Sequence, residues 1–119
     1  MTPQELKART KQFALRVLSL VAALPKTIEG LAVVDQLVRC GTSVAANYRS
    51  ACRARSKAEF VAKLGVVLEE ADETQLWLEL IVEGKLLAAK RVEPLLNEAT
   101  ELLAIFVTSR KSASANLKS

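Results

Sequence analysis

Apolar residues recur every three or four positions along four segments of this sequence, and this spacing is typical of amphipathic helices. No segment shows the strict alternation of a half-buried strand. The pattern predicts helices at about residues 4–24, 27–53, 56–83 and 91–110. Because the connections are short, neighbouring helices are expected to run antiparallel. We therefore predict an all-α, antiparallel up-down four-helix bundle over residues 1–111, followed by a flexible polar tail at 112–119.

Residues with clear capping preferences lie at the ends of these predicted helices. Thr2 suits the N-cap of the first helix, and Pro3 is tolerated in its first turn. Ser56 and Glu59 have the spacing of a capping box at the start of the third helix. Gly84 is expected as the C′ residue that ends the third helix.

The third predicted helix carries apolar residues outside its main stripe. Val66, Trp77 and Leu80 share a second face, which Ile81 widens. A monomeric bundle of this size would leave such residues exposed, and an exposed apolar patch usually marks an interface. The pattern therefore predicts self-association through Val66, Trp77 and Leu80. The alternative is that the helices are rotated differently and that Trp77 belongs to the core.

Composition argues for one non-catalytic domain. The 119 residues suit a single domain, and half of them are hydrophobic although only five are aromatic. The chain contains no histidine, so the usual general base for a Ser or Cys nucleophile is missing. It also lacks a Gly-rich phosphate-binding loop. We therefore expect a protein that is not an enzyme.

Metal sites, disulfides and membrane segments are not expected either. Cys40 and Cys52 would lie about 18 Å apart along one helix, which is too far for a disulfide. Without histidine or a CxxC pair, neither a zinc site nor a di-metal carboxylate site is expected, and we predict no cofactor. The N-terminus does not resemble a signal peptide, and no apolar run approaches the roughly 20 residues that cross a bilayer. We expect a cytoplasmic protein with no membrane partner.

The formal net charge of +4 is unevenly distributed. Cations gather around the connection between the second and third helices, at Arg39, Arg49, Arg53, Arg55, Lys57 and Lys63. Six acids and no base lie between Glu69 and Glu83. The third helix thus carries cations near its start and anions towards its end. The helix macrodipole prefers the reverse order by a few tenths of a kcal/mol to about 1 kcal/mol per group.

Two explanations of this charge pattern are open. In the first, the basic turn at 53–57 of one subunit meets the acidic segment of another and helps to define an assembly. In the second, the turn belongs to a phosphate-binding surface, because arginine offers planar, bidentate donors to phosphate. The second explanation gives the following nucleic-acid-binding residues: Arg49, Arg53, Arg55, Lys57 and Lys63.

A polar cluster is predicted between the second and third helices. Arg39, Ser43 and Asn47 lie on one helical face because they are four residues apart. A partly buried Asn47 would need partners, and carboxylates of the antiparallel third helix are candidates. These carboxylates are Glu69, Asp72 and Glu73. The cluster is either a clasp that defines the register of the two helices or a ligand-contacting site.

The stretch 36–49, with the pattern R-x-x-x-S-x-x-x-N, resembles the signature of the bacterial "four helix bundle protein" family, also called 23S ribosomal RNA intervening-sequence proteins. The similarity continues through the pattern R-x-x-S-x-x-E-F at 53–60 and reaches 77–78. The signature positions are Arg39, Ser43, Asn47, Arg53, Ser56, Glu59 and Phe60. Where relatives often carry Arg after Gly30, this chain has Leu31.

The resemblance implies an up-down four-helix bundle that assembles into homopentamers. It also implies a relationship to the accessory proteins of diversity-generating retroelements, which are basic pentamers that bind nucleic acid and a reverse transcriptase. Our first hypothesis is a non-enzymatic homo-oligomer, a pentamer, whose basic surface binds RNA or DNA and which has a further protein partner. The alternative is a purely structural or protein-binding module whose basic turn makes subunit contacts.

Overall fold

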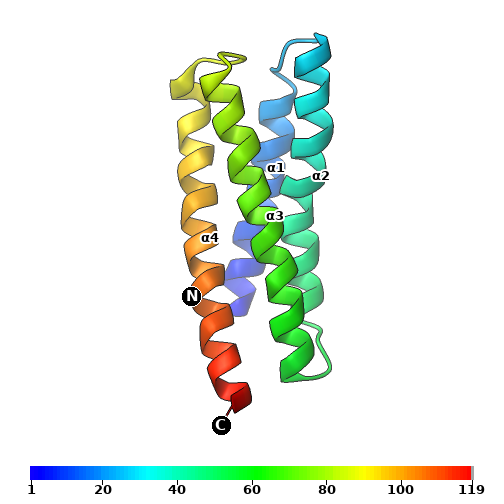
Figure 1. Cartoon of the computed structure of the whole chain (residues 1–119), viewed down its shortest axis with the longest axis vertical. Helices are drawn as coiled ribbons and strands as arrows, with labels where there is room; N and C mark the ends of the chain where they lie inside the picture. Colours follow the sequence, from blue (N-terminus) through cyan, green and yellow to red (C-terminus); the bar gives the residue numbers. More distant parts are fainter. Residues whose placement is uncertain (119) are drawn as a thin grey trace.

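The computed structural model describes residues 1–118, which form four helices joined by short loops. Helix α1 is Pro3–Val21, α2 is Ile28–Ala51, α3 is Lys57–Glu83 and α4 is Ala89–Lys118. The helices lie side by side in an elongated bundle of 51 × 21 × 20 Å, and consecutive helices run in opposite directions (Figure 1). Helices α1 and α4 pack against each other less extensively than the pairs that are consecutive in the sequence. The predicted all-α fold of four helices is confirmed.

The helix starts are capped by hydroxyl side chains, as the sequence predicts for α1 and α3. Thr2 Oγ1 accepts a hydrogen bond from the backbone N–H of Glu5 at 3.1 Å. Ser56 Oγ accepts one from the backbone N–H of Glu59, also at 3.1 Å. The second half of the capping box is displaced by one residue, because the Glu59 carboxylate accepts from the N–H of Arg55 at 3.2 Å instead of from Ser56. Each cap satisfies backbone donors that a helix start leaves unpaired.

The C-terminal end of α3 differs from its prediction. Gly84 is the C-cap residue and has a right-handed conformation, so it is not the C′ residue. Lys85 takes that position with a positive φ of 56°. The N–H groups of Lys85 and Leu86 donate to the carbonyls of Val82 and Ile81 at 3.1 and 2.9 Å, which is the Schellman pattern. A lysine therefore adopts the left-handed conformation that glycine adopts without strain.

Helix α4 is longer than predicted at both ends. It begins at Ala89, so that Pro94 lies beyond the first turn, where it removes one backbone donor from the helix. It continues to Lys118, so residues 112–118 of the predicted tail are helical; their flexibility stays a prediction, and residue 119 lies outside the described residues. Two alanines in this part of the helix, Ala113 and Ala115, favour helical structure, and Ala113 is half-buried.

The core consists of the inward faces of all four helices. Its largest fully buried apolar side chains are Phe13, Val17, Leu37, Val44, Leu64, Val67, Leu78, Ile81, Val92, Leu102 and Phe106. The prediction that Ile81 faces outward was wrong, because it is fully buried. Thr74 is also fully buried and donates its hydroxyl to the carbonyl of Glu70 at 2.7 Å. Helix α3 packs between α2 and α4, so it buries a wider arc than one apolar stripe.

Helices α1 and α2 approach closely at Gly41. A Cβ atom at this position would lie 2.9 Å from Val17 Cγ2, which is closer than side-chain carbons normally pack. Both cysteines are free: Cys40 is buried in α2, and Cys52 is half-buried at its C-cap. Burial raises the pKa of the Cys40 thiol.

A bidentate ion pair connects α1 to α4 across their smaller interface. The guanidinium of Arg9 donates two hydrogen bonds to the Glu98 carboxylate, both at 2.7 Å, and one to Glu101 at 2.9 Å. The hydrogen bonds from Arg9 hold the pKa of Glu98 below its usual value. Glu98 is only 14% exposed, so this pair is less screened by water than a surface salt bridge.

Candidate nucleic-acid interface

Four cations from two helices gather on one face of the bundle. They are Lys7 and Lys11 of α1 and Arg49 and Arg53 of α2. Together they line a surface depression of about 460 Å³. Lys7 is half-buried and the other three are exposed. We call these four residues the basic cluster.

The spacing and the helix register explain how the basic cluster forms. The two cations in each helix are four residues apart, so both project from the same side of that helix. Because the antiparallel helices meet where Gly41 contacts Val17, the start of α1 lies beside the end of α2. Within residues 1–118, none of the four cations forms an ion pair with a carboxylate. The cluster therefore presents positive charge that the chain itself does not neutralise.

The five predicted nucleic-acid-binding residues lie in three different settings, and two lysines of α1 lie beside two of them. Arg49 and Arg53 belong to the basic cluster, whereas Arg55 and Lys57 are exposed in and after the α2–α3 turn. Lys63 is already engaged, because its Nζ donates to Ser50 Oγ at 2.8 Å and pairs with Glu59. The sequence reasoning missed Lys7 and Lys11, whose i, i+4 spacing was the only available signal.

Glu59 lies close to the α2–α3 turn, and its carboxylate contacts two neighbouring residues. The backbone N–H of Arg55 donates to the Glu59 carboxylate, and Lys63 lies 3.2 Å from its other oxygen. These contacts, the backbone hydrogen bond first, lower the pKa of Glu59. Glu59 therefore stays ionised at neutral pH and is partly neutralised by Lys63. It stabilises the conformation of the turn that carries Arg55.

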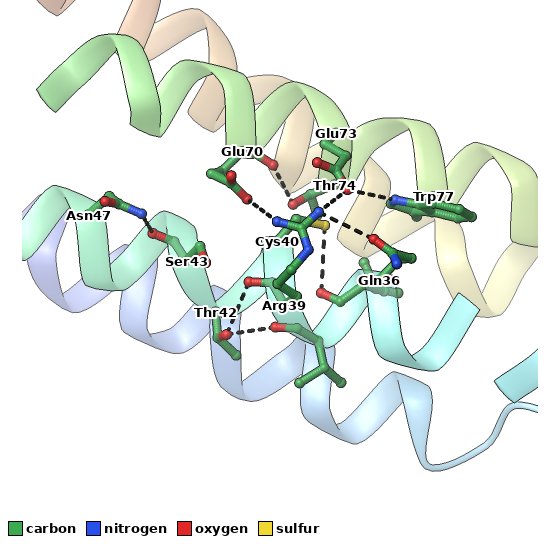
Figure 2. Close-up of polar contacts among 12 residues, drawn as sticks. Gln36, Arg39, Cys40, Thr42, Ser43, Asn47, Glu70, Glu73, Thr74 and Trp77 are labelled. Carbon is green, nitrogen blue, oxygen red and sulfur yellow. Dashed lines mark hydrogen bonds and ion pairs between the residues drawn. The ribbon is translucent and has the colours of Figure 1, made fainter. Parts of the chain in front are cut away.

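A second polar site joins α2 to α3 around Arg39. Figure 2 shows the Arg39 guanidinium lying between the carboxylates of Glu70 and Glu73. It pairs with Glu70 at 3.1 Å and with Glu73, while Glu73 also accepts a hydrogen bond from Trp77 Nε1 at 3.1 Å. The hydrogen bonds from Arg39 and then Trp77 lower the pKa of Glu73. These contacts connect α2 to α3, and we call Arg39, Glu70 and Glu73 the clasp; that it defines the register of the two helices stays a prediction.

The predicted membership of this clasp was only partly right. Arg39 and Glu73 belong to it, but Asn47 Nδ2 donates to the carbonyl of Ser43 at 2.9 Å, within α2. Figure 2 shows this pair further along α2, away from Arg39. Glu69 and Asp72 are exposed and make no hydrogen bond to Asn47 in the part of the chain that the structure describes. The carbonyl one turn back satisfies the Asn47 amide, so no cross-helix partner is required.

The predicted interface residues lie on the outer side of α3. Val66 and Leu80 are 41% and 42% exposed, and Leu76 between them is 49% exposed. Trp77 is half-buried at the edge of this face, where it packs against the core. Leu31 in α2 is 54% exposed. Self-association through the outer face of α3 stays a prediction.

Neither a metal site nor a membrane span is visible in the described structure. In residues 1–118, no three Cys, Asp or Glu side chains come together as ligands for an ion. Among the same residues, no helix is both long enough and apolar enough to cross a bilayer.

Comparisons with known proteins agree with this architecture. Residues 4–108 match the family described as 23S rRNA-intervening sequence protein. A crystal structure of a protein of unknown function from the S23 ribosomal protein family of Bacteroides thetaiotaomicron VPI-5482 is similar, with 32% sequence identity and a TM-score of 0.85. The similarity covers 93% of this chain and 99% of that chain. No curated protein is significantly similar. Since the family match spans most of its length, the chain belongs to the 23S rRNA-intervening sequence protein family.

Proposed function

We propose that this protein is a non-enzymatic, homo-oligomeric helical bundle that binds RNA or DNA through the basic cluster. The observation that supports this proposal most directly is the gathering of four cations from α1 and α2 without a carboxylate partner in the described residues. Lysine and arginine side chains bind the phosphate backbone and release its condensed counterions. Arginine adds bidentate geometry that suits phosphate oxygens.

The number of cations sets the expected salt dependence. If all four contact phosphates, the slope of log affinity against log salt is about −3 to −4, since each contact contributes about −0.7 to −0.9. Raising the salt from about 50 to 200 mM would then weaken binding about 100-fold. The contacts are made to the backbone, so affinity should depend weakly on base sequence.

Fluorescence anisotropy titrations with labelled RNA and DNA at several salt concentrations test this proposal. The variant Arg49→Ala plus Arg53→Ala should weaken binding and reduce the slope by about 1.5. Lys26→Ala plus Lys90→Ala is the charge-matched control, because both lysines are exposed at the opposite end of the bundle. Equal losses in the two double variants, or a flat salt dependence of the wild type, would refute the proposal.

We also propose that five copies assemble through the outer face of α3. This face combines the exposed apolar side chains of Val66, Leu76 and Leu80 with acids, so it offers both apolar area and charge for a partner copy. Light scattering should give a mass of five chains at micromolar concentration. Leu76→Glu plus Leu80→Glu should lower that mass. Ala104→Glu, on the exposed side of α4, should leave it unchanged. A wild type with the mass of one chain would refute self-association.

The alternative function is a structural or protein-binding module in which cations serve assembly. It is favoured by Glu79 and Glu83, which have no ion-pair partner in the described residues. In that case Arg53 and Arg55 would pair with these acids in a neighbouring copy. The variant Arg53→Ala plus Arg55→Ala would then lower the assembly mass without changing nucleic-acid affinity.

A further inference from the structure

A groove lies at the end of the bundle next to the basic cluster. It is formed where the α2–α3 turn meets the start of α1 and the last turns of α4, and its volume is about 470 Å³. Its lining includes Tyr48, Cys52, Ala54 and Phe60 from α2, the turn and α3, and Ala113 from α4. The lining is mainly carbon. The groove is thus an apolar recess with Arg55 and Lys57 in its lining and the basic cluster beside it.

Two kinds of side chain give the groove its chemical character. Phe60 is half-buried and presents part of its ring to the groove, whereas Tyr48 is almost fully buried beneath it and packs against Phe106 with ring centroids 5.6 Å apart. Arg55 and Lys57 also line the groove, and both are exposed. The recess therefore combines an aromatic, apolar floor with cations at its rim.

The groove and the basic cluster lie next to each other. Cys52 and Ala54 line the groove, and Arg53 between them lines the basic depression. In the same way, Pro3 lines the groove and Gln4 lines the depression. A polyanion that lies on the basic cluster would therefore pass beside the groove.

We infer that this end groove receives an unpaired nucleobase of a single-stranded nucleic acid whose backbone lies on the basic cluster. The inference rests on the proposed function and specifies its substrate class. Bases of single strands stack on aromatic side chains, with Phe60 as the platform here, while Arg55 and Lys57 contact the flanking phosphates. Bases inside a duplex are stacked on one another, so they cannot enter the groove without unpairing. The protein therefore prefers single strands to duplexes.

Filling the groove tests this inference in the full-length protein. Ala113→Trp places a large ring in the groove without removing a cation, and Ala115→Trp places the same ring on the exposed side of the same helix as a matched control. The probes are a labelled single strand of about 12 nucleotides and the duplex of the same sequence, measured at one salt concentration. Ala113→Trp should weaken single-strand binding about tenfold, as expected for the loss of one stacked base, and leave duplex binding unchanged. Ala115→Trp should change neither.

A second variant separates an effect on binding from an effect on folding. Phe60→Leu retains an apolar side chain but removes the aromatic ring, and it should weaken single-strand binding several-fold with an unchanged thermal unfolding midpoint. Equal effects of Ala113→Trp on single strands and duplexes, or no effect of either groove variant, would overturn the inference while leaving the proposed function intact. Absence of any nucleic-acid binding by the wild type would overturn both this inference and the proposed function. Displacement of the single strand by a fatty acid, but not by nucleotides, would assign the groove to a lipid tail and also overturn the inference.

Discussion

Replacing Gly41 by alanine tests how closely α1 and α2 pack. The added Cβ atom would lie 2.9 and 3.0 Å from the two γ-carbons of Val17, which is fully buried and cannot move aside into solvent. Gly65 in α3 provides a matched control in another helix interior. The three atoms nearest to a Cβ at Gly65 belong to the guanidinium end of Arg110, the closest at 3.0 Å; Arg110 is exposed, and its Nε donates to the Val61 carbonyl at 3.1 Å.

Two opposing contributions determine how much each substitution changes the free energy of unfolding. Alanine is favoured over glycine in a helix interior by about 1 kcal/mol. Overpacking a close-packed core costs about 1–3 kcal/mol. Gly41→Ala should therefore destabilise the protein by about 1 kcal/mol, because the steric cost exceeds the propensity gain. Gly65→Ala should stabilise it by about 0.5 kcal/mol, because a displaced Arg110 costs less than the propensity gain.

Urea unfolding followed by helical circular dichroism, at one protein concentration, measures both variants. The double variant Val17→Ala plus Gly41→Ala adds a stringent check, since the smaller residue at 17 makes room for the new methyl group. Its cost should be smaller than the sum of the single costs by about 1 kcal/mol. Strict additivity, or a Gly41→Ala variant at least as stable as Gly65→Ala, would refute the close contact between α1 and α2.

Three further predictions concern helix ends and the α1–α4 ion pair. Ser56→Ala should lower the free energy of unfolding by about 1 kcal/mol, because it removes the cap of α3, whereas Ser56→Asp should restore it. Lys85→Gly should raise the free energy of unfolding by about 0.5–1 kcal/mol, since glycine adopts the positive φ without strain; a loss of stability would contradict this. Arg9 lowers the pKa of Glu98 in the folded state, so this pair stabilises the protein above the unfolded-state pKa near 4.3 and ceases to do so as the pH falls through the lower folded-state value. Glu98→Gln should therefore cost about 1 kcal/mol at pH 7 and progressively less below pH 4, and a cost independent of pH would contradict this explanation.

The fold was predictable because its signals are local. Capping hydroxyls, a stripe of apolar residues and short connections each act within a few residues, so they identified four helices and two of the caps correctly. The errors lie where tertiary packing decides. Ile81 faces the core because α3 is covered on two sides by α2 and α4, and the apolar pattern around such a helix does not define one inward direction. Lys85, rather than Gly84, has the left-handed conformation, because the Schellman hydrogen bonds are donated by Lys85 and Leu86 and make Lys85 the C′ residue.

Only two of the four residues of the basic cluster were predicted from the sequence. Arg49 and Arg53 stood out as cations on one helix, but Lys7 and Lys11 are more than 35 positions away in the sequence and join them only through the register of α1 and α2. The hydrogen bond between Lys63 and Ser50 was likewise not predictable, because Ser50 lies on the neighbouring helix and does not enter the charge pattern. In each case the missing information is the pairing of two helices.

The order of charges along α3, which the helix macrodipole disfavours, is compensated only in part, by ion pairs within α3 and with α2. Lys63 pairs with Glu59, and Glu73 pairs with Arg39 of α2. The exposed Lys57 at the start of α3 has no such partner in the described residues, so it is unfavourable by a few tenths of a kcal/mol. It lies beside the groove and near the basic cluster, and its charge adds to theirs instead of being cancelled. The proposed binding end thus concentrates positive potential, and the acids on the outer face of α3 repel phosphate from the rest of that helix. If the protein binds a polyanion as proposed, these charges would steer it to that end of the bundle, and Lys57 would contribute there although isolated-helix physics disfavours a cation at a helix start.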